Sequence, residues 1–475
     1  MFYIRRILGG SPKTSFTFFV TLKYYASRHI FERSDGMNLN FKLSRSIYRP
    51  LIVGVDTKIP LQNGQSATAI NFDNAASTPP FTSVLEEINQ FSTIYSSIHR
   101  GTGYKSQLSS KLFEEARSVI LKFVNADQHK DTVIYVKNTT EAINKLAYRL
   151  WDGDKRSVVL STWMEHHSND LPWRGKFKVD YVQTDSRGKF SLEDLESKLI
   201  RHKGNVKLVT VTGASNVTGY VNPIHKIAEL AHRYKAKILV DGAQLVPHNS
   251  INMNPKNPLQ KIDYLAFSAH KMYAPFGIGV LIGPKETFIK GVSEFVGGGT
   301  AQVVTHDWVM WEDAPHKDEA GSPNVVGVIA LVAAIKTLTS IGMQTIDQYE
   351  NQLTLYANSK LQSIPGLTLY SHTALGEPRI GVIPFNINGM AHETVATILS
   401  KHAGIAVRTG CFCTQPYIQQ LLSISPKQME FYRKNADAPR PGIVRLSFGL
   451  YNDFSEIDSL AHILERIVKH PTTFG

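Results

Sequence analysis

Residues 237–271 contain two short aliphatic strands that each end on an ionisable side chain. The first reads KILVDGAQ over residues 237–244, and the second reads YLAFSAHK over residues 264–271. Ligands of open parallel sheets bind beyond the carboxyl ends of the strands, where Asp241 and Lys271 stand. A buried carboxylate needs a positive partner, and a shielded lysine loses its proton easily. The stretch therefore predicts a cofactor site at one edge of a sheet.

Short runs rich in β-branched residues alternate with helical stretches on both sides of this segment, from about residue 71 to residue 283. This alternation predicts a mostly parallel sheet with helices on both faces. The expected strands are residues 132–136, 157–161, 206–211, 237–240 and 264–267. The expected helices are residues 113–125, 140–150, 192–201 and 223–234.

The remaining chain divides into a leader and two domains. Residues 1–36 contain six Lys or Arg against two acidic residues, which is typical of an organellar transit peptide, and an over-extended start with Met37 as first residue is the alternative. Localisation is accordingly cytoplasmic, or mitochondrial or plastid if the leader is a targeting segment. We predict a large domain over residues 37–335, whose N-terminal segment packs on the small domain, and an α+β domain over residues 336–475.

Composition excludes several classes of protein. With 475 residues, 42% hydrophobic and 19% charged, the chain is typical of a soluble globular protein. No stretch approaches the roughly 20 apolar residues that span a bilayer. The net charge is +12, but the sequence has no run of basic residues interleaved with aromatic residues. This distribution favours the binding of small anionic ligands over nucleic acid. The two cysteines, Cys411 and Cys413, cannot form a disulfide scaffold.

Polar groups follow two other predicted strands. Thr139 and Thr140 begin a helix, whose free N–H groups suit an anion, although either residue could simply cap the helix. His166 and His167 lack a matching carboxylate or cysteine set, so no metal is predicted, and one ring would face a cofactor and the other solvent. Asp241 could likewise cap a helix or bind magnesium. Neither the P-loop of kinases nor the glycine-rich dinucleotide turn of dehydrogenases follows a strand.

Six segments resemble the class V aminotransferase family in their order and spacing. They are NFDNAAST (71–78), NTTE (138–141), MEHH (164–167), SNVTG (215–219), DGAQ (241–244) and SAHK (268–271). Within that family the resemblance is to SufS-type (group II) cysteine desulfurases, which include selenocysteine lyases. It implies the type I fold of transferases that depend on pyridoxal 5'-phosphate (PLP). That fold has a mostly parallel seven-stranded sheet with helices on both faces and a smaller α+β C-terminal domain.

The resemblance also implies a role for individual residues. Lys271 would hold PLP as a Schiff base and take the α-proton of the substrate, and Asp241 would pair with the ring nitrogen. The other implied cofactor contacts are Gln244 with the ring hydroxyl, His166 with the ring face, Asn216 beside the ring, and Thr139, Thr140, Ser268 and His270 with the phosphate. In a homodimer, Ser322 would reach the phosphate of the neighbouring subunit. Arg445 would bind the substrate carboxylate, and Asn216 and His99 would line its pocket.

The segment RTGCFCTQP, residues 408–416, resembles the cysteine loop of these enzymes. The resemblance implies that Cys413 takes sulfur from L-cysteine as a persulfide and releases L-alanine. The sulfur would pass to a sulfur-acceptor protein, for iron–sulfur cluster assembly or another sulfur-transfer pathway. Only a thiolate is competent for this attack.

The sequence departs from the family at three places, and alternatives stay open. Cys411 and Phe412 stand where many relatives have two histidines, and Cys411 could resolve a persulfide, link to Cys413 or be a spectator. Residues 433–441 predict a long loop, and Asn138 replaces a common glycine. The alternative function is another class V enzyme (selenocysteine lyase, aminotransferase, epimerase or C–S lyase) in which Cys413 is not the nucleophile. A non-catalytic binding module is disfavoured by Lys271 and Asp241.

Overall fold

A seven-stranded sheet forms the centre of the protein. The computed structural model describes residues 45–185, 187–371 and 377–471, so the leader prediction for residues 1–36 lies outside the described residues. The strands, in order across the sheet, are β4 (Asp131–Val136), β10 (Gly279–Pro284), β9 (Tyr264–Ser268), β8 (Lys237–Asp241), β7 (Val206–Thr212), β5 (Val158–Thr162) and β6 (Lys178–Val182). Strand β10 runs antiparallel to both of its neighbours, and the other pairs are parallel. The predicted mostly parallel, seven-stranded sheet is confirmed.

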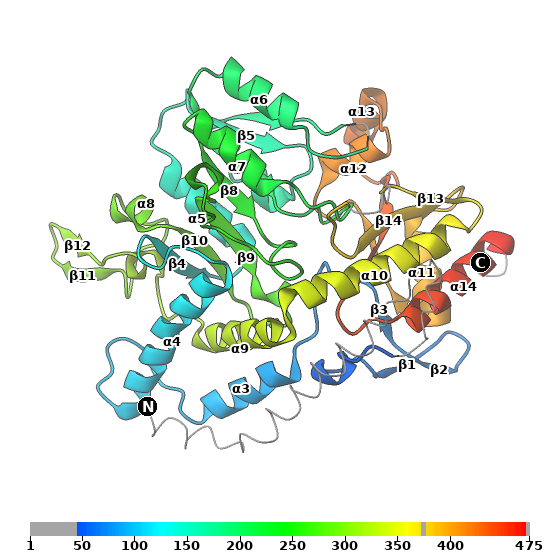
Figure 1. Ribbon diagram of the computed structural model, residues 1–475, viewed down its shortest axis with the longest axis horizontal. Coiled ribbons are helices and arrows are strands. Elements are labelled where there is room, and N and C mark those ends of the chain that lie inside the picture. Colours follow the sequence, from blue (N-terminus) through cyan, green and yellow to red (C-terminus); the bar gives the residue numbers. More distant parts are fainter. Residues whose placement is uncertain (1–44, 186, 372–376, 472–475) are drawn as a thin grey trace.

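Helices cover both faces of this sheet, as predicted (Figure 1). Along β4, Ile134 and Val136 pack with α5, whereas Val133 and Tyr135 belong to the core under α4, α7 and α9. Successive side chains of a strand point to opposite faces, so a strand that is apolar throughout must be covered twice. The helices in this part are α3 (Thr82–Ser92), α4 (Tyr104–Phe123), α5 (Thr139–Leu150), α6 (Leu192–Arg201), α7 (Ile224–Arg233), α8 (Lys285–Ile289) and α9 (Val325–Ile341).

The sequence pattern missed two of the seven strands, for different reasons. Strand β6 lies at the edge of the sheet and is only partly buried, so it lacks a continuous apolar run. Strand β10 begins in a segment interpreted as a glycine turn. A Cβ atom at Gly279 would lie 2.7 Å from Cα of Asn138, so this glycine permits the close approach of β10 to the start of α5.

A smaller four-stranded sheet forms the C-terminal part, in the order β13 (Leu367–Leu369), β14 (Val382–Ile387), β17 (Ile443–Ser447), β16 (Arg408–Gly410). Its helices are α10 (Met343–Gln362), α11 (His392–Ala403), α12 (Gln415–Leu421), α13 (Pro426–Lys434) and α14 (Phe454–Lys469). Helix α10 runs from the end of α9 toward the small sheet (Figure 1). The sequence pattern missed α12 and α13, and the predicted long loop begins after α13, at residue 435. The predicted boundary between residues 335 and 336 stays a prediction.

Two segments between residues 49 and 71 lie against the C-terminal part. Strand β3 (Ile70–Asn71) pairs in parallel with β15 (Ile405–Ala406). Arg49 is buried and donates hydrogen bonds to Glu456 at 2.7 Å and to Asp56 at 2.9 Å. The remaining short strands form two hairpins, β1 (Lys58–Pro60) with β2 (Ser66–Thr68) and β11 (Ala301–Val304) with β12 (Val309–Trp311).

Among the described residues, no single helix is long and apolar enough to cross a membrane. Helices α9 and α10 together would satisfy length and composition, but they are bent by 77° where they meet. Most of α9 is buried in the core of the protein, which accounts for its apolar composition.

Substituting Arg49→Ala is expected to lower the free energy of unfolding by about 3–5 kcal/mol, because it leaves the carboxylate of Glu456 buried without its partner. Arg45→Ala is the matched control, since Arg45 is exposed and only 3.7 Å from Asp56. Denaturant unfolding of both variants measures the difference. Equal unfolding midpoints for the two variants would contradict this anchoring role.

Candidate active site

Asp241 and Lys271 lie at the carboxyl ends of the neighbouring parallel strands β8 and β9. Asp241 is the last residue of β8 and is 3% exposed. Lys271 ends the short 3-10 helix that directly follows β9. The charges of Asp241 and Lys271 interact with each other. The sequence prediction that the two side chains meet at one edge of the sheet agrees with these positions, while their roles stay predictions.

Burial sets the protonation of this pair. It lowers the pKa of the Lys271 amine to about 8, and the nearby Asp241 carboxylate opposes that shift. Burial also raises the pKa of Asp241, while its hydrogen bond from the Ala243 N–H and the charge of Lys271 lower it. A lysine with this pKa has a substantial neutral fraction near pH 8, which both Schiff-base formation and proton removal require.

Gln244 has hydrogen-bonding capacity that the described residues do not use. The Gln244 side-chain amide donates to the carbonyl of Ala75 at 2.7 Å, but its Oε1 is buried and has no partner among the described residues. Buried polar atoms are nearly always paired, so an unpaired one beside a reactive lysine favours a ligand there. A carboxylate and an amide oxygen fit the ring nitrogen and ring hydroxyl of PLP.

The start of helix α5 forms the other end of the site. The Ser268 hydroxyl accepts a hydrogen bond from the Thr139 N–H at 2.8 Å and lies 2.7 Å from its Oγ1. The exposed hydroxyl of Thr140 lies 2.7 Å from that of Ser168. His270 is half-buried, and burial lowers its pKa to about 4. Four hydroxyls, those of Thr139, Thr140, Ser168 and Ser268, therefore lie at or beside a helix N-terminus where the sequence predicts a phosphate.

His166 lies among the charges of the site. Burial lowers its pKa to about 3, and the charges of Lys271, His167 and Arg445 add to that effect. Its Nδ1 accepts a hydrogen bond from the Ser168 N–H at 3.1 Å, so the proton of the neutral ring is on Nε2. The ring is therefore neutral near pH 7, which suits stacking on a cofactor ring.

The second histidine contacts the cysteine loop, although the sequence assigned one ring of the pair to solvent. The N–H of His167 donates to the Cys413 carbonyl at 2.6 Å, and its Nε2 accepts from the Gln415 N–H at 3.4 Å. The side chain is half-buried. His166 and His167 together join the cofactor end of the site to the loop, which adjacent residues can do because their side chains diverge.

Arg445 is buried at the centre of the site and bound to a carboxylate. Its guanidinium donates to Asp73 Oδ1 and to the Asn216 carbonyl, both at 3.0 Å. Its buried Nε has no hydrogen-bond partner among the described residues. Burial lowers the pKa of Arg445 to about 10, and Asp73 opposes that shift. The side chain stays charged at neutral pH and keeps a free donor for a carboxylate.

The cysteine loop is a tight turn that exposes Cys413. The Thr414 N–H donates to the Cys411 carbonyl at 2.8 Å, and the two residues between them, Phe412 and Cys413, have φ angles of 49° and 54°. Left-handed conformations cost about 1–3 kcal/mol each for such residues. The Asn216 amide holds the turn, donating to the Phe412 carbonyl at 2.9 Å and accepting from the Thr414 hydroxyl at 3.1 Å.

The sulfur of Cys413 faces the charged centre of the site. It is exposed to solvent and interacts electrostatically with both Lys271 and Arg445. The Arg445 guanidinium also lies 4.8 Å from the centre of the Phe412 ring. The loop therefore brings the Cys413 thiol close to the two cationic side chains of the site.

Two predicted site residues contact neither this centre nor each other in the described structure. The His99 ring lies 3.1 Å from Glu114 and 5.0 Å, between ring centres, from His316. The ligand atoms of these three residues lie within 4.8 Å of one another, although the sequence predicts no metal. Ser322 is exposed in the loop before α9. Their expected pocket and phosphate contacts stay predictions.

Two carboxylates of the site were missed by the sequence reasoning. Asp73 stands within a quoted family segment but received no role, and its spacing from Arg445 of 372 residues offers no local signal. Glu165 is buried behind His166 and accepts hydrogen bonds from Thr162 and Asn169, both at 2.6 Å. Burial raises its pKa to about 8. An acidic residue directly after an apolar strand was the available signal.

Comparison with known proteins places the chain in a family. Residues 70–460 match the Aminotransferase class-V family.

The chain belongs to the class V aminotransferase family.

A probable cysteine desulfurase of Synechocystis sp. is 35% identical over 84% of this chain and 91% of its own. A cysteine desulfurase of Wigglesworthia glossinidia brevipalpis is 34% identical over 86% of this chain and 94% of its own. Both matches cover most of each protein, which agrees with the class V assignment.

Solved structures agree with this assignment. The cysteine desulfurase of Thermococcus onnurineus NA1 superposes with a TM-score of 0.75 at 30% identity, covering 84% of this chain and 95% of its own. The cysteine desulfurase CsdA of Escherichia coli gives a TM-score of 0.73 at 27% identity, covering 89% and 98%. The class V fold predicted from the sequence is thus confirmed, and the chain is an enzyme by family.

Amine labelling of the cofactor-free protein tests the lowered pKa of Lys271. Its reactivity is expected to rise through about pH 8, because only the neutral amine is nucleophilic, whereas exposed lysines titrate near about 10.4. In Asp241→Asn the rise is expected at lower pH, since the carboxylate that stabilises the ammonium is gone. Mass spectrometry reads Lys271 against the exposed Lys155. Identical pH profiles for both lysines would refute the lowered pKa.

Proposed function

We propose that the protein is a PLP-dependent cysteine desulfurase, which converts L-cysteine to L-alanine and keeps the sulfur as a persulfide on Cys413. The observation that carries this proposal is the turn that exposes Cys413 beside Lys271 and Arg445. An incidental cysteine has no need of two adjacent left-handed residues held by Asn216. Relatives and structural neighbours that carry the name cysteine desulfurase support the same function.

The proposed cofactor site suits PLP, because the buried Oε1 of Gln244 has no partner among the described residues. Lys271 would bind the cofactor, Asp241 and Gln244 its ring, His166 its face, and the start of α5 its phosphate. When bound, PLP supplies an electron-poor ring that takes up the electron pair released at the substrate Cα. Asp241 is suited to this because its buried negative charge keeps a ring nitrogen protonated.

Arg445 binds the substrate in this proposal. Its guanidinium is held at one end by the Asn216 carbonyl, and its remaining donors suit a carboxylate in two-point contact. Asp73 now occupies part of that place, so an entering substrate carboxylate competes with it. The positive charge and fixed position of Arg445 orient the amino acid with its side chain toward Cys413.

Lys271 and Cys413 carry the bond changes. Lys271, neutral in part near pH 8, takes the proton from the substrate Cα. The Cys413 thiolate attacks the substrate sulfur, the bond between that sulfur and the substrate Cβ breaks, and its electron pair stays on carbon. Protonation of that carbon and return of a proton from Lys271 to the substrate Cα give alanine, and Cys413 retains the sulfur as a persulfide. No external oxidant or reductant enters this balance.

A homodimer and a separate sulfur-acceptor protein belong to the proposal. The hairpin β11–β12 extends from the body of the protein (Figure 1) and exposes apolar side chains, including Val304 and Trp308. Ser322 is exposed as well, as a residue that serves a second subunit would be. Iron–sulfur cluster assembly or another sulfur-transfer pathway would receive the sulfur, and the cytoplasm or, with a targeting leader, an organelle would house it.

Alanine and sulfide release from L-cysteine, in the presence of a reductant, tests the reaction. Cys413→Ala and Lys271→Ala are both expected to lose release, and Cys413→Ala should keep PLP bound because the thiol does not hold the cofactor. The two products and the PLP absorbance are measured for each variant and for the wild type. Equal alanine release by wild type and Cys413→Ala would leave another class V reaction in its place.

Arg445→Ala is expected to raise the KM for L-cysteine roughly 10- to 150-fold, because a hydrogen-bonded ion pair contributes about 1.5–3 kcal/mol. Arg433→Ala is the control, since its guanidinium binds Glu430 on the exposed face of α13. Steady-state kinetics of both variants give the comparison. An unchanged KM in Arg445→Ala would remove Arg445 from the substrate site.

A further inference from the structure

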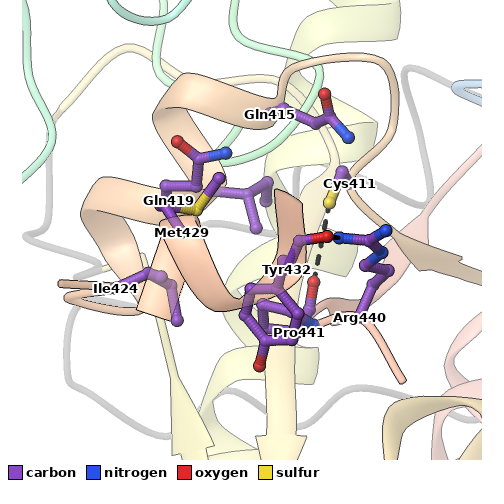
Figure 2. Close-up of a pocket in the computed structure, with 9 residues that line it drawn as sticks. Cys411, Gln415, Gln419, Ile424, Met429, Tyr432, Arg440 and Pro441 are labelled. Atoms are coloured by element: carbon purple, nitrogen blue, oxygen red, sulfur yellow. Dashed lines mark hydrogen bonds between the residues drawn. The ribbon is translucent and has the colours of Figure 1, made fainter. Parts of the chain in front are cut away.

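The second cysteine of the loop lies on the other side of the turn from the catalytic centre. Cys411 is half-buried, and its sulfur lies 3.6 Å from the Pro441 carbonyl, to which it can donate. It lines a cavity of about 50 Å³ between α12, α13 and residues 440–441. In Figure 2 its sulfur points toward Pro441, with Arg440 beside it. The loop thus presents one thiol to the active site and one to a separate pocket.

This pocket suits a sulfur atom that carries charge. Ile418, Ile424 and Met429 give it an apolar, polarisable wall. Arg440 brings a positive charge, with its guanidinium held by the carbonyls of Tyr432 at 2.8 Å and Ala436 at 3.0 Å. A water molecule needs about 10–15 Å³ in such a cavity, so there is room for an additional sulfur and part of an incoming thiol.

The turn brings the two thiols within reach of each other. Residues 411 and 413 are separated by one residue of a tight turn closed by the hydrogen bond from Thr414 to Cys411. Two Cα atoms so placed are roughly 5–6 Å apart, inside the window in which two cysteine sulfurs can bond. The electrostatic interaction between the two sulfurs agrees with this closeness.

We propose that Cys411 is a second sulfur carrier, which takes the sulfane sulfur from Cys413 and presents it to a thiol acceptor in the pocket between α12 and α13. The proposal rests on the desulfurase function of Cys413. It assigns the α12–α13 segment, whose two helices the sequence pattern missed, the role of a shielded exit for sulfur. The proposed acceptor class is a thiol, because thiol–persulfide exchange transfers sulfane sulfur without an external oxidant or reductant.

The transfer is balanced between the two cysteines. The Cys411 thiolate attacks the outer sulfur of the Cys413 persulfide, a new sulfur–sulfur bond forms, and the old one breaks. Its electron pair stays on the Cys413 sulfur, which takes up a proton. Burial raises the pKa of the Cys411 thiol, and the thiolate of a thiol with a higher pKa is intrinsically more nucleophilic.

The holoenzyme is mixed with L-cysteine without added reductant or acceptor, and alanine is counted per active site in the burst that precedes slow turnover by the thiol of L-cysteine itself. Burst amplitude counts the sulfur that the enzyme can store. Wild type is expected to release about two alanines per active site, because transfer of the first sulfur to Cys411 lets Cys413 react a second time. Cys411→Ser is expected to release about one, which is a twofold difference. Gln419→Ala, which alters the same pocket without removing a thiol, should keep the larger burst. Alkylation followed by peptide mass spectrometry locates the sulfur on Cys411 or Cys413.

The outcomes separate this proposal from the function on which it rests. Sulfur on both cysteines, with a halved burst in Cys411→Ser, supports the relay. Bursts of equal size in wild type and Cys411→Ser, with sulfur only on Cys413, overturn the relay and leave the desulfurase intact, whether the shared burst is one alanine or a larger number from a polysulfide chain. No persulfide on Cys413 overturns both.

Discussion

The burial of Asp241 opposite Lys271 is the constraint on which the rest of the site depends. Neither charge would be stable alone at the ends of two aliphatic strands, because desolvation penalises each of them. Adjacent parallel strands place the two groups at one edge of the sheet, where each partly offsets the burial of the other. Because Asp241 offsets the burial of Lys271 only in part, the pKa of Lys271 stays lowered. This lowered pKa makes the amine reactive near neutral pH.

A second ion pair organises the substrate side of the site. Arg445, from the small sheet, is buried against Asp73, which precedes the first helix of the large part. The same arginine binds the carbonyl of Asn216, whose side chain holds the cysteine loop. In the proposed function, substrate binding by Arg445 and placement of the thiol by Asn216 therefore meet at the hydrogen bond between these two residues.

The cysteine loop combines strain with exposure. Two consecutive left-handed residues are costly, and they persist because Asn216, His167 and Thr414 fix the backbone around them. The result is a thiol that faces the two cations of the site while the neighbouring thiol of Cys411 faces a different pocket. A relaxed, extended loop of the same sequence would not separate the environments of the two sulfurs in this way.

The sequence by itself determined the class of fold, and it predicted which polar residues stand at the carboxyl ends of the central strands. Strand ends are local features, so Asp241, Lys271, His166 and the start of α5 could be found from apolar runs and the polar residues that follow them. Strands β6 and β10 escaped because one is a half-exposed edge and the other opens with a glycine that a turn would also use. The segments that resemble the class V family then implied roles for the other predicted site residues.

Only the tertiary structure decided which groups meet across long distances in the chain. The pairing of Arg445 with Asp73, the grip of Asn216 on the cysteine loop and the pocket beside Cys411 all join segments far apart in sequence. Local patterns carry no information on such contacts, because they depend on how the two sheets pack. For the same reason, the family resemblance could assign His99 to the substrate pocket, while its ring contacts lie with Glu114 and His316.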